Sequence, residues 1–191
     1  MYLGSEVGVL KYGNIVGRLL VTRKSHKLLL RGFDSHPRNM DKYFRTEGGE
    51  RVNVVEHCRE ILFAHPNAEI LIGTDSQNSK RHSRYSTVIV FRYGKCGAHY
   101  IYNTISIPKI KDLFSRLFKE AELSIEIAEY ITHNTSYKVA AIELDFNDFK
   151  ITKSTPLISA TKGWCESLGY KAVLKSGEMI ACKAADHCCR E

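Results

Sequence analysis

The sequence predicts an α/β fold, in which helices flank a mixed five-stranded sheet and a β-rich extension precedes it. Three observations support this class. The 191 residues are 43% hydrophobic, which suits one compact domain, or one domain with an appended segment. Short apolar runs and helical patterns follow one another in the order βββαβαβα. The alternation in the second half implies crossover connections, and therefore a sheet that mixes parallel and antiparallel strands.

An N-terminal extension is predicted over residues 1–49. Two apolar runs, residues 7–12 and 15–22, are separated by turn-forming residues and suggest a β-hairpin. The pair Gly48-Gly49 marks a boundary, so the main domain is predicted to span residues 50–191.

Five strands and four helices are predicted in the main domain. The first three strands form a meander, because a short turn separates the second from the third. Apolar residues at helical spacing identify the helices, and Gly169 ends one of them. In chain order the elements are a helix at 52–64, strands at 69–73, 86–93 and 98–107, a helix at 112–132, a strand at 138–144, a helix at 155–168, a strand at 170–175 and a helix at 179–190.

Positive and negative charges are concentrated in adjacent parts of the chain. The formal net charge is +7, residues 80–119 hold nine Lys or Arg and one Asp, and residues 120–148 hold seven acids and one Lys. A basic rim that binds a polyanion beside a carboxylate-rich centre would have this pattern. Two ordinary solvated faces would have it as well.

Several functional classes are excluded by missing motifs. The usual glycine-rich dinucleotide and P-loop motifs do not occur, nor does a Gly-x-Ser-x-Gly elbow. No apolar run reaches the ~20 residues of a membrane helix, and no secretion signal is present, so we expect a soluble cytoplasmic protein. The six cysteines lack the spacing of a zinc site or a disulfide framework, and we expect free, mostly buried thiols.

Two acidic residues follow predicted strands directly. Asp75 ends the strand at residues 69–73, and Asp145 ends the strand at residues 138–144. Ligands bind at the C-terminal edge of sheets with crossover helices, because loops open there. Each residue alone is equally well explained as a turn residue or a helix cap.

Two further carboxylates lie on predicted helices. Glu120 falls within the apolar arc of its helix, where a charged side chain needs a cation or hydrogen-bond donors. An ion pair with Arg116, or a side chain that reaches the sheet edge, would also accommodate it. Asp186 follows Ala184-Ala185 on the last helix and is a candidate fourth carboxylate, although a surface acid near the C-terminus is the simpler explanation.

Four converging carboxylates would repel one another unless divalent cations lay between them. Hard oxygen ligands are those that Mg²⁺ or Mn²⁺ prefers. Two such ions would activate a water molecule and stabilise the leaving oxygen of a phosphodiester. The candidate catalytic and metal-binding residues are Asp75, Glu120, Asp145 and Asp186.

These motifs resemble the YkuK-type family of the ribonuclease H-like superfamily over roughly residues 50–191. The resemblance implies a ribonuclease H-like fold, whose element order agrees with the pattern above. It also implies that the four carboxylates form a two-metal site. The matching segments are Ile72-Gly73-Thr74-Asp75-Ser76-Gln77, residues 87–91, Arg116-Leu117 with Glu120, Leu144-Asp145-Phe146-Asn147 with Lys153-Ser154, and Ala184-Ala185-Asp186.

A basic loop is predicted next to Asp75, over residues 78–85. Its cations are expected to contact phosphates and Tyr85 to stack on a base, although a solvated loop has the same composition. A second cation lies shortly after Asp145, where a helix cap at Ser154 is the alternative explanation. The candidate phosphate contacts are Lys80, Arg81, Arg84 and Lys153.

The function expected from the sequence is therefore a metal-dependent nuclease. Its substrate would be RNA, DNA or an RNA–DNA hybrid, and water would be the nucleophile in a two-metal mechanism. One alternative is a catalytically inactive ribonuclease H-like module that binds nucleic acid. The other is a protein-interaction adaptor that uses residues 1–49.

Overall fold

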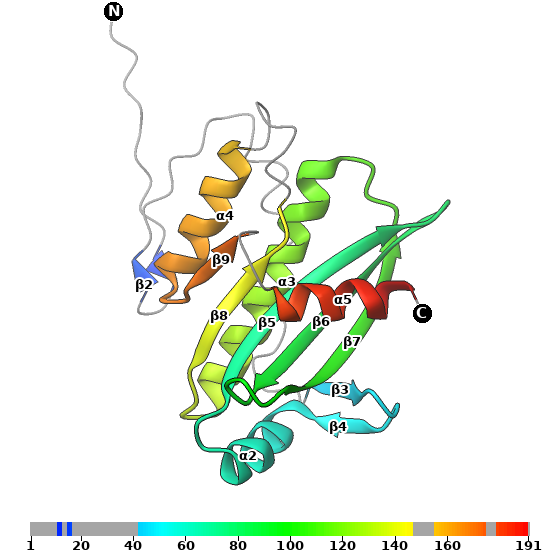
Figure 1. The fold of residues 1–191 in the computed structure, drawn as a ribbon. Helices are drawn as coiled ribbons and strands as arrows, with labels where there is room; N and C mark the ends of the chain where they lie inside the picture. The colour runs from blue at the N-terminus through cyan, green and yellow to red at the C-terminus, as the bar shows by residue number, and fades with distance from the viewer. Residues whose placement is uncertain (1–10, 13–14, 17–41, 147–154, 175–178, 191) are drawn as a thin grey trace, which may run out of the picture. The chain divides into compact units, whose positions relative to one another are not determined.

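The computed structural model describes residues 11–12, 15–16, 42–146, 155–174 and 179–190 (Figure 1). The chain divides into two compact units, Met1–Met40 and Asp41–Glu191. In the first unit, β1 (Lys11–Tyr12) and β2 (Ile15–Val16) pair as antiparallel strands. All the candidate functional residues lie in the second unit.

The second unit is built on a seven-stranded mixed sheet. Strands β5, β8 and β9 are parallel neighbours, and every other pair is antiparallel, as the predicted crossover connections require. All five predicted strands are present, and β5 and β6 are longer than predicted. The sheet order is β4 (Arg51–Asn53), β3 (Tyr43–Thr46), β7 (Ala98–Pro108), β6 (His82–Arg92), β5 (Glu69–Asn78), β8 (Val139–Leu144) and β9 (Ala172–Leu174).

Strands β3 and β4 add to one edge of the sheet beyond the five predicted strands. Arg45 and Thr46 of β3 pair with Tyr102 and Ile101 of β7. Phe44 is only 2% exposed and belongs to the main core. The predicted boundary at residues 49 and 50 falls in the turn between these strands, where Gly49 has a φ of 83°. The sheet therefore begins before residue 50, because Phe44 is buried in its core.

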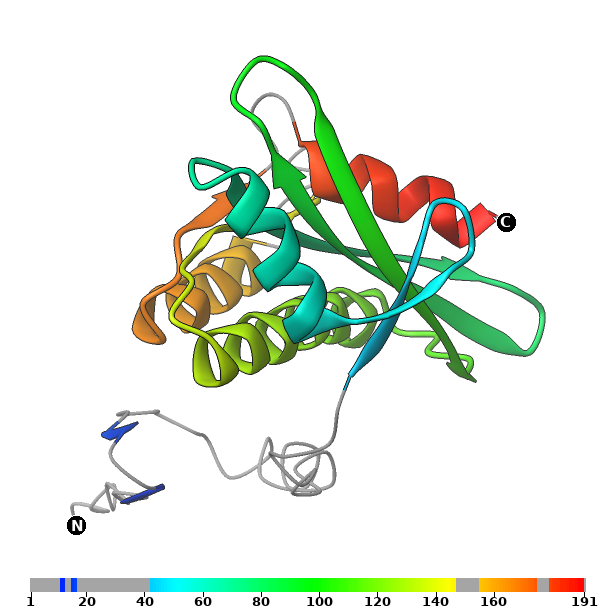
Figure 2. The ribbon, with the colours of Figure 1, turned by 90° about the horizontal axis from the view of Figure 1, so that it is seen from below.

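Helices cover both faces of the sheet (Figure 2). Residues of α2, α3 and α4 pack in one hydrophobic cluster, and residues of α5 pack in a second cluster with Leu71, Val88 and Val90. In the part of the chain that the structure describes, no helix is both long and apolar enough to cross a membrane. The helices are α2 (Val54–Ala64), α3 (Leu113–Asn134), α4 (Thr155–Ser167) and α5 (Ile180–Arg190).

Helix α3 positions the candidate Glu120. It begins after Asp112, whose carboxylate accepts the N–H of Ser115 at 2.7 Å and so caps the helix. The buried positions of α3 start at Glu120 and include Ser124 and Ala128, as the predicted arc requires. The helical spacing also places Leu113 on the apolar arc of this helix and so predicts that Leu113 is buried. Leu113 is instead 56% exposed, because the first turn of α3 lies outside the core.

All six cysteines are free thiols, as predicted. Five of them are buried, and Cys96, in the turn between β6 and β7, is exposed. Burial raises the pKa of the Cys58 and Cys165 thiols, to about 12 and about 11 respectively. Both are therefore inert neutral groups of the core near neutral pH.

Candidate active site

Asp75 lies within β5, just beyond the part of that strand that pairs with β8, and Asp145 directly follows β8. In the register of β5 and β8, Ile72 is opposite Ile142 and Gly73 is opposite Glu143. Asp75 and Asp145 each follow two residues later, on strands about 4.8 Å apart. Figure 1 shows the ends of both strands and the first turns of α3 along the same edge of the sheet.

The Asp75 carboxyl is partly buried on the face of β5 that α5 covers. Burial raises its pKa to about 6, and the negative charges of Asp186 and Asp145 raise it as well. A backbone hydrogen bond from Ser76 and the Arg116 guanidinium act in the opposite direction. Asp75 therefore interacts electrostatically with Asp186 and Asp145, and it acts on Glu120 as well.

Glu120 is nearly completely buried, at 4% exposure. Burial raises the pKa of its carboxyl to about 8, and both Asp75 and Asp145 contribute to the increase. The Ser76 hydroxyl donates a hydrogen bond to Glu120 Oε1 at 2.5 Å. The ion pair with Arg116 is not formed within the described residues, and Arg116 acts on Glu120 only through its charge.

Small hydroxyl groups continue the polar environment of Glu120 along the same face of β5. Thr74 Oγ1 lies 2.8 Å from Ser124 Oγ and 3.0 Å from Thr87 Oγ1. The alternation of β5 places Thr74 and Ser76 on one face and Asp75 on the other. Glu120 and Asp75 thus approach the sheet edge from its two sides.

Asp186 lies on α5 and forms an ion pair one turn along the helix. Its carboxylate accepts hydrogen bonds from Arg190 Nε and Nη2 at 2.6–3.1 Å. The side chain is 48% exposed, so this ion pair contributes little to the free energy of unfolding. Asp186 nevertheless raises the pKa of Asp75, which places its charge near the other carboxylates.

Two residues that the sequence analysis missed hold α5 in place. The buried Glu143 carboxylate accepts the first N–H groups of α5, from Ile180, Ala181 and Cys182, at 2.8–3.3 Å. Burial raises the pKa of Glu143, and these backbone donors lower it. A Cβ atom on Gly73 would lie 2.8 Å from the backbone nitrogen of Cys182. In the sequence, the signal that could have identified Glu143 is the presence of a glutamate inside the apolar run of β8.

The chemistry of this donor set fits a hard divalent cation. The charge of Asp145 raises the pKa of both Asp75 and Glu120, and burial has removed much of the hydration of these two carboxyls. Within the described residues, however, no group of three or more Asp, Glu, His or Cys side chains is arranged to hold a metal ion. Glu120 is turned toward Ser76 and Asp186 toward Arg190.

A family model described as ribonuclease H-like matches residues 53–190, which include all four carboxylates. The chain belongs to the ribonuclease H-like family. The match confirms the resemblance to the YkuK-type proteins of that superfamily. The mixed sheet with helices on both faces is consistent with the ribonuclease H-like fold. The comparison with curated proteins gives no significant match.

The predicted nucleic-acid contacts of this ribonuclease H-like protein differ in their exposure. Most of the predicted loop belongs to strands β5 and β6, which leaves Lys80 and Arg81 exposed in a short turn and Arg84 half-buried in β6. Tyr85 is fully buried, so its predicted stacking on a base is wrong. Strand β6 starts at His82, so Tyr85 is part of this strand and its side chain is buried in the protein interior. Burial raises the pKa of the Tyr85 hydroxyl to about 12. Lys153 lies outside the described residues.

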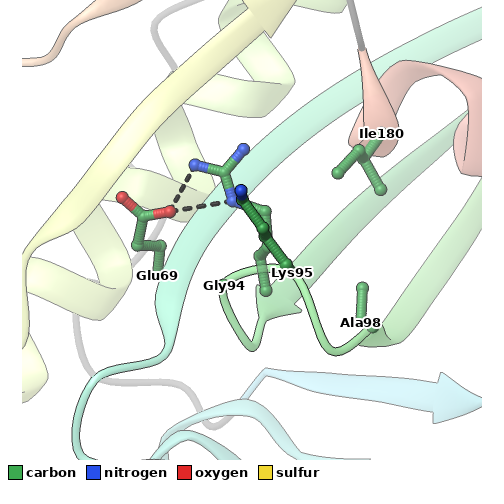
Figure 3. Close-up of a pocket in the computed structure, with 7 residues that line it drawn as sticks. Glu69, Gly94, Lys95, Ala98 and Ile180 are labelled. Atoms are coloured by element: carbon green, nitrogen blue, oxygen red, sulfur yellow. Dashed lines mark hydrogen bonds and ion pairs between the residues drawn. The ribbon is translucent and has the colours of Figure 1, made fainter.

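A cavity of about 730 Å³ lies at the other end of β5 in the ribonuclease H-like domain (Figure 3). Its lining includes Glu69, Lys95, Ala98 and Ile180, and Arg92 Nε donates to Glu69 Oε2 at 2.8 Å. None of the four candidate carboxylates lines it. The candidate active site is therefore the carboxylate edge of the sheet, and this cavity is separate from it.

Proposed function

We propose that this protein is a metal-dependent nuclease that hydrolyses phosphodiester bonds of RNA, DNA or an RNA–DNA hybrid. One observation carries the proposal. Glu120 is buried at the sheet edge of a ribonuclease H-like domain, and Asp75 and Asp145 raise its pKa. Such a cluster of acidic groups is costly to ionise without a compensating charge, and divalent cations would provide that charge.

Asp75, Glu120, Asp145 and Asp186 would hold two Mg²⁺ or Mn²⁺ ions. When bound, such ions supply a Lewis acid and lower the pKa of water, which helps both the attacking and the leaving oxygen of a phosphodiester. Asp186 would exchange its exposed partner Arg190 for this role, at little cost because the ion pair is solvated.

Other side chains would orient the site and offset its charge. The Ser76 hydroxyl directs Glu120 Oε1 toward the end of β5. The Arg116 guanidinium lowers the pKa of both Asp75 and Glu120, and so favours the ionised carboxylates that can bind cations. Lys80, Arg81 and Arg84 would contact the phosphates of the substrate, because all three lie on the hairpin that continues from Asp75.

A second candidate function is a nucleic-acid-binding module without turnover. Two features favour it: the described residues contain no three-ligand metal group, and Asp186 is paired with Arg190. In this case the carboxylates would be a remnant of the family's site, and the basic side chains would be the functional groups.

The first prediction separates the two candidates. The protein, with Asp75→Asn and Glu120→Gln variants, is incubated with labelled single strands, duplexes, hybrids and branched substrates in Mg²⁺, Mn²⁺ or chelator. We expect metal-dependent cleavage, and a loss of at least about 100-fold in each variant, because several kcal/mol of transition-state stabilisation disappear. Glu129→Gln, on the other side of α3, is the matched control and should cleave at the normal rate.

The outcomes of this experiment are distinct. Cleavage that persists in chelator, or in Asp75→Asn, contradicts the two-metal proposal. Binding without cleavage by the unchanged protein, under all metal conditions, supports the non-catalytic module.

A further inference from the structure

A basic arm projects from the sheet beyond the candidate active site. Strands β5 and β6 form a long hairpin, whose tip reaches past the other elements in Figure 1. The connection from β7 to α3 runs beside this tip. We define the basic arm by the exposed residues of the tip and of the connection, namely Lys80, Arg81, His82, Lys109 and Lys111.

Hydrogen bonds tie the two segments of the basic arm together. The N–H of Lys109 donates to the Arg81 carbonyl at 3.0 Å. Asn78 Nδ2 donates to the Ile110 carbonyl at 3.2 Å, and the N–H of Ile110 donates to Ser83 Oγ at 2.8 Å. Ser83 Oγ in turn donates to Asn78 Oδ1 at 2.6 Å. Positive charges that are far apart in the sequence are therefore presented by one stiffened unit.

Within the described part of the chain, no carboxylate is paired with the lysines and the arginine of the basic arm. Among the residues described, no ion pair involves Lys80, Arg81, Lys109 or Lys111. Elsewhere some surface cations are paired, for example Arg92 with Glu69 and Lys162 with Glu166, whereas others, such as Lys95 and Lys138, form no ion pair among the described residues. Unpaired positive charges held close together repel one another, and a polyanion would relieve that repulsion.

The basic arm is continuous with the carboxylate edge. Arg84, opposite Gln77 on the hairpin, lies between Asp75 and the tip. Lys80 is five residues beyond Asp75, in the turn after β5, so it lies at most about 17 Å from Asp75 along the chain. One strand of a duplex advances about 3.4 Å per nucleotide, so this distance spans at most about five nucleotides.

We propose that the basic arm binds the backbone phosphates of a polynucleotide within about five nucleotides of the bond that lies at the carboxylate edge. The binding requires only the cations of the arm. The separation in nucleotides between the arm and the cleaved bond rests on the proposed nuclease function. The contact is electrostatic and independent of sequence, since Lys and Arg at phosphates carry no base readout.

The second prediction tests the basic arm by binding in chelator, so that turnover is not needed. Anisotropy of labelled duplex and single-stranded DNA and RNA is measured between about 50 and 200 mM salt. Lys80→Ala/Arg81→Ala and Lys109→Ala/Lys111→Ala are compared with Lys95→Ala/Lys138→Ala. The control variant removes the same amount of charge from two exposed lysines outside the basic arm. Lys95 lies in the turn between β6 and β7, and Lys138 directly precedes β8.

Each arm variant is expected to bind about 10- to 50-fold more weakly near 100 mM salt than the unchanged protein. The slope of log affinity against log salt should fall by about 1.8 on duplexes and about 1.4 on single strands, because two phosphate contacts are lost. The control pair should keep most of the affinity. Circular dichroism checks that all variants are folded.

Equal binding by the arm variants and the control pair overturns the proposal, even if cleavage is observed. Absence of polynucleotide binding by the unchanged protein overturns it as well. Binding that depends on the arm, without any cleavage, supports the arm and contradicts only the nuclease function. Where cleavage occurs, bonds with at least about five nucleotides on one side should be preferred, and the arm variants should lose this preference.

Discussion

Glu120 shows how a single residue sets the chemistry of the candidate site. Its carboxylate is withdrawn from water, and among the described residues the Ser76 hydroxyl of β5 donates a hydrogen bond to it. A neutral residue here would pack at lower cost, since burying a carboxylate is unfavourable unless it is compensated. The cost is understandable if the carboxylate binds cations.

Two histidines, separate from the candidate carboxylates, form a hydrogen-bonded pair. His57 of α2 and His99 of β7 face each other with 2.8 Å between their Nε2 atoms. Phe91 packs against both rings, and Glu60 lies 4.0 Å from His57 Nδ1. Only one proton can occupy the space between the two Nε2 atoms, so the second imidazole must accept that hydrogen bond.

The third prediction concerns the pH dependence of stability. Burial lowers the pKa of both His57 and His99, and Glu47, Glu50 and Glu60 only partly oppose this. Below the unfolded pKa of about 6.5, the unfolded chain therefore binds more protons than the folded chain. The contribution of this histidine pair to the free energy of unfolding should fall as the pH decreases from 7 toward 5, whereas the carboxyls of Asp75 and Glu120, whose pKa values are raised, act in the opposite direction.

Thermal unfolding of the protein and of His99→Asn across this pH range checks the expectation. Relative to the unchanged protein, the Tm of the variant should rise as the pH decreases from 7 toward 5, because one of the two buried imidazoles is absent. His82→Asn, which removes an exposed imidazole, is the control and should behave as the unchanged protein. An identical pH profile for His99→Asn would contradict the assignment.

At the scale of an element, the position of α5 decides where Asp186 lies. The Glu143 carboxylate caps the helix from the neighbouring strand, and Gly73 permits its backbone to approach β5 closely. Cys189 Sγ, at the other end of α5, donates to the Asp75 carbonyl at 3.1 Å. The helix is thereby held at both ends against the strands that carry Asp75 and Asp145.

The fourth prediction compares two glycine substitutions. A Cβ atom at Gly73 would lie 2.8 Å from one backbone atom of α5 and 3.0 Å from another, and backbone cannot move aside locally. Gly73→Ala should lower the free energy of unfolding by about 1–3 kcal/mol, and displace α5. A Cβ atom at Gly163, inside α4, would have no neighbour within 4 Å, so Gly163→Ala should stabilise by about 0.5–1 kcal/mol.

Denaturant titration of both variants measures these differences. The two substitutions add the same methyl group, so a destabilisation confined to Gly73→Ala identifies steric conflict with α5 as the cause. A Gly73→Ala variant as stable as the unchanged protein would show that α5 does not pack this closely.

At the scale of the whole molecule, the sheet separates two hydrophobic clusters. The larger cluster joins α2, α3 and α4 to one face, and it includes Phe44 of β3. Lys42 also forms an ion pair with Glu126 of α3, and its carbonyl accepts the N–H of Val54. The segment from Asp41 is therefore an integral part of the second unit.

The fifth prediction compares two shortened chains. A chain of residues 41–191 should keep its free energy of unfolding to within about 1 kcal/mol, because it retains the whole sheet and both clusters. A chain of residues 50–191 loses Phe44 and the pairing of β3 with β7, and should be less stable by at least about 3 kcal/mol.

Chemical denaturation of both chains provides the measurement. Equal stability of the two would place the boundary of the folded domain near residue 50, as the Gly48-Gly49 pair predicts. Loss of a cooperative transition in residues 41–191 would show that the first unit contributes to the core.

Much of the fold was predictable from local patterns. The alternation in β5 and β8 and the helical spacing in α3 follow from neighbouring residues, because each element has a face that must leave water. The same periodicities placed Asp145 beyond its strand and Glu120 on the buried side of its helix, whereas Asp75, predicted to end its strand, lies within the longer β5. These positions depend on the period of each element, which the sequence by itself contains.

The tertiary structure alone decided which partners these side chains meet. Tyr85 became buried because β6 extends further than its apolar run, and Asp186 found Arg190. Glu143 reached the start of α5, and Lys109 came to lie beside Arg81. Such contacts join residues far apart in the chain, and no periodicity encodes them, because they arise from how complete elements pack around a shared sheet.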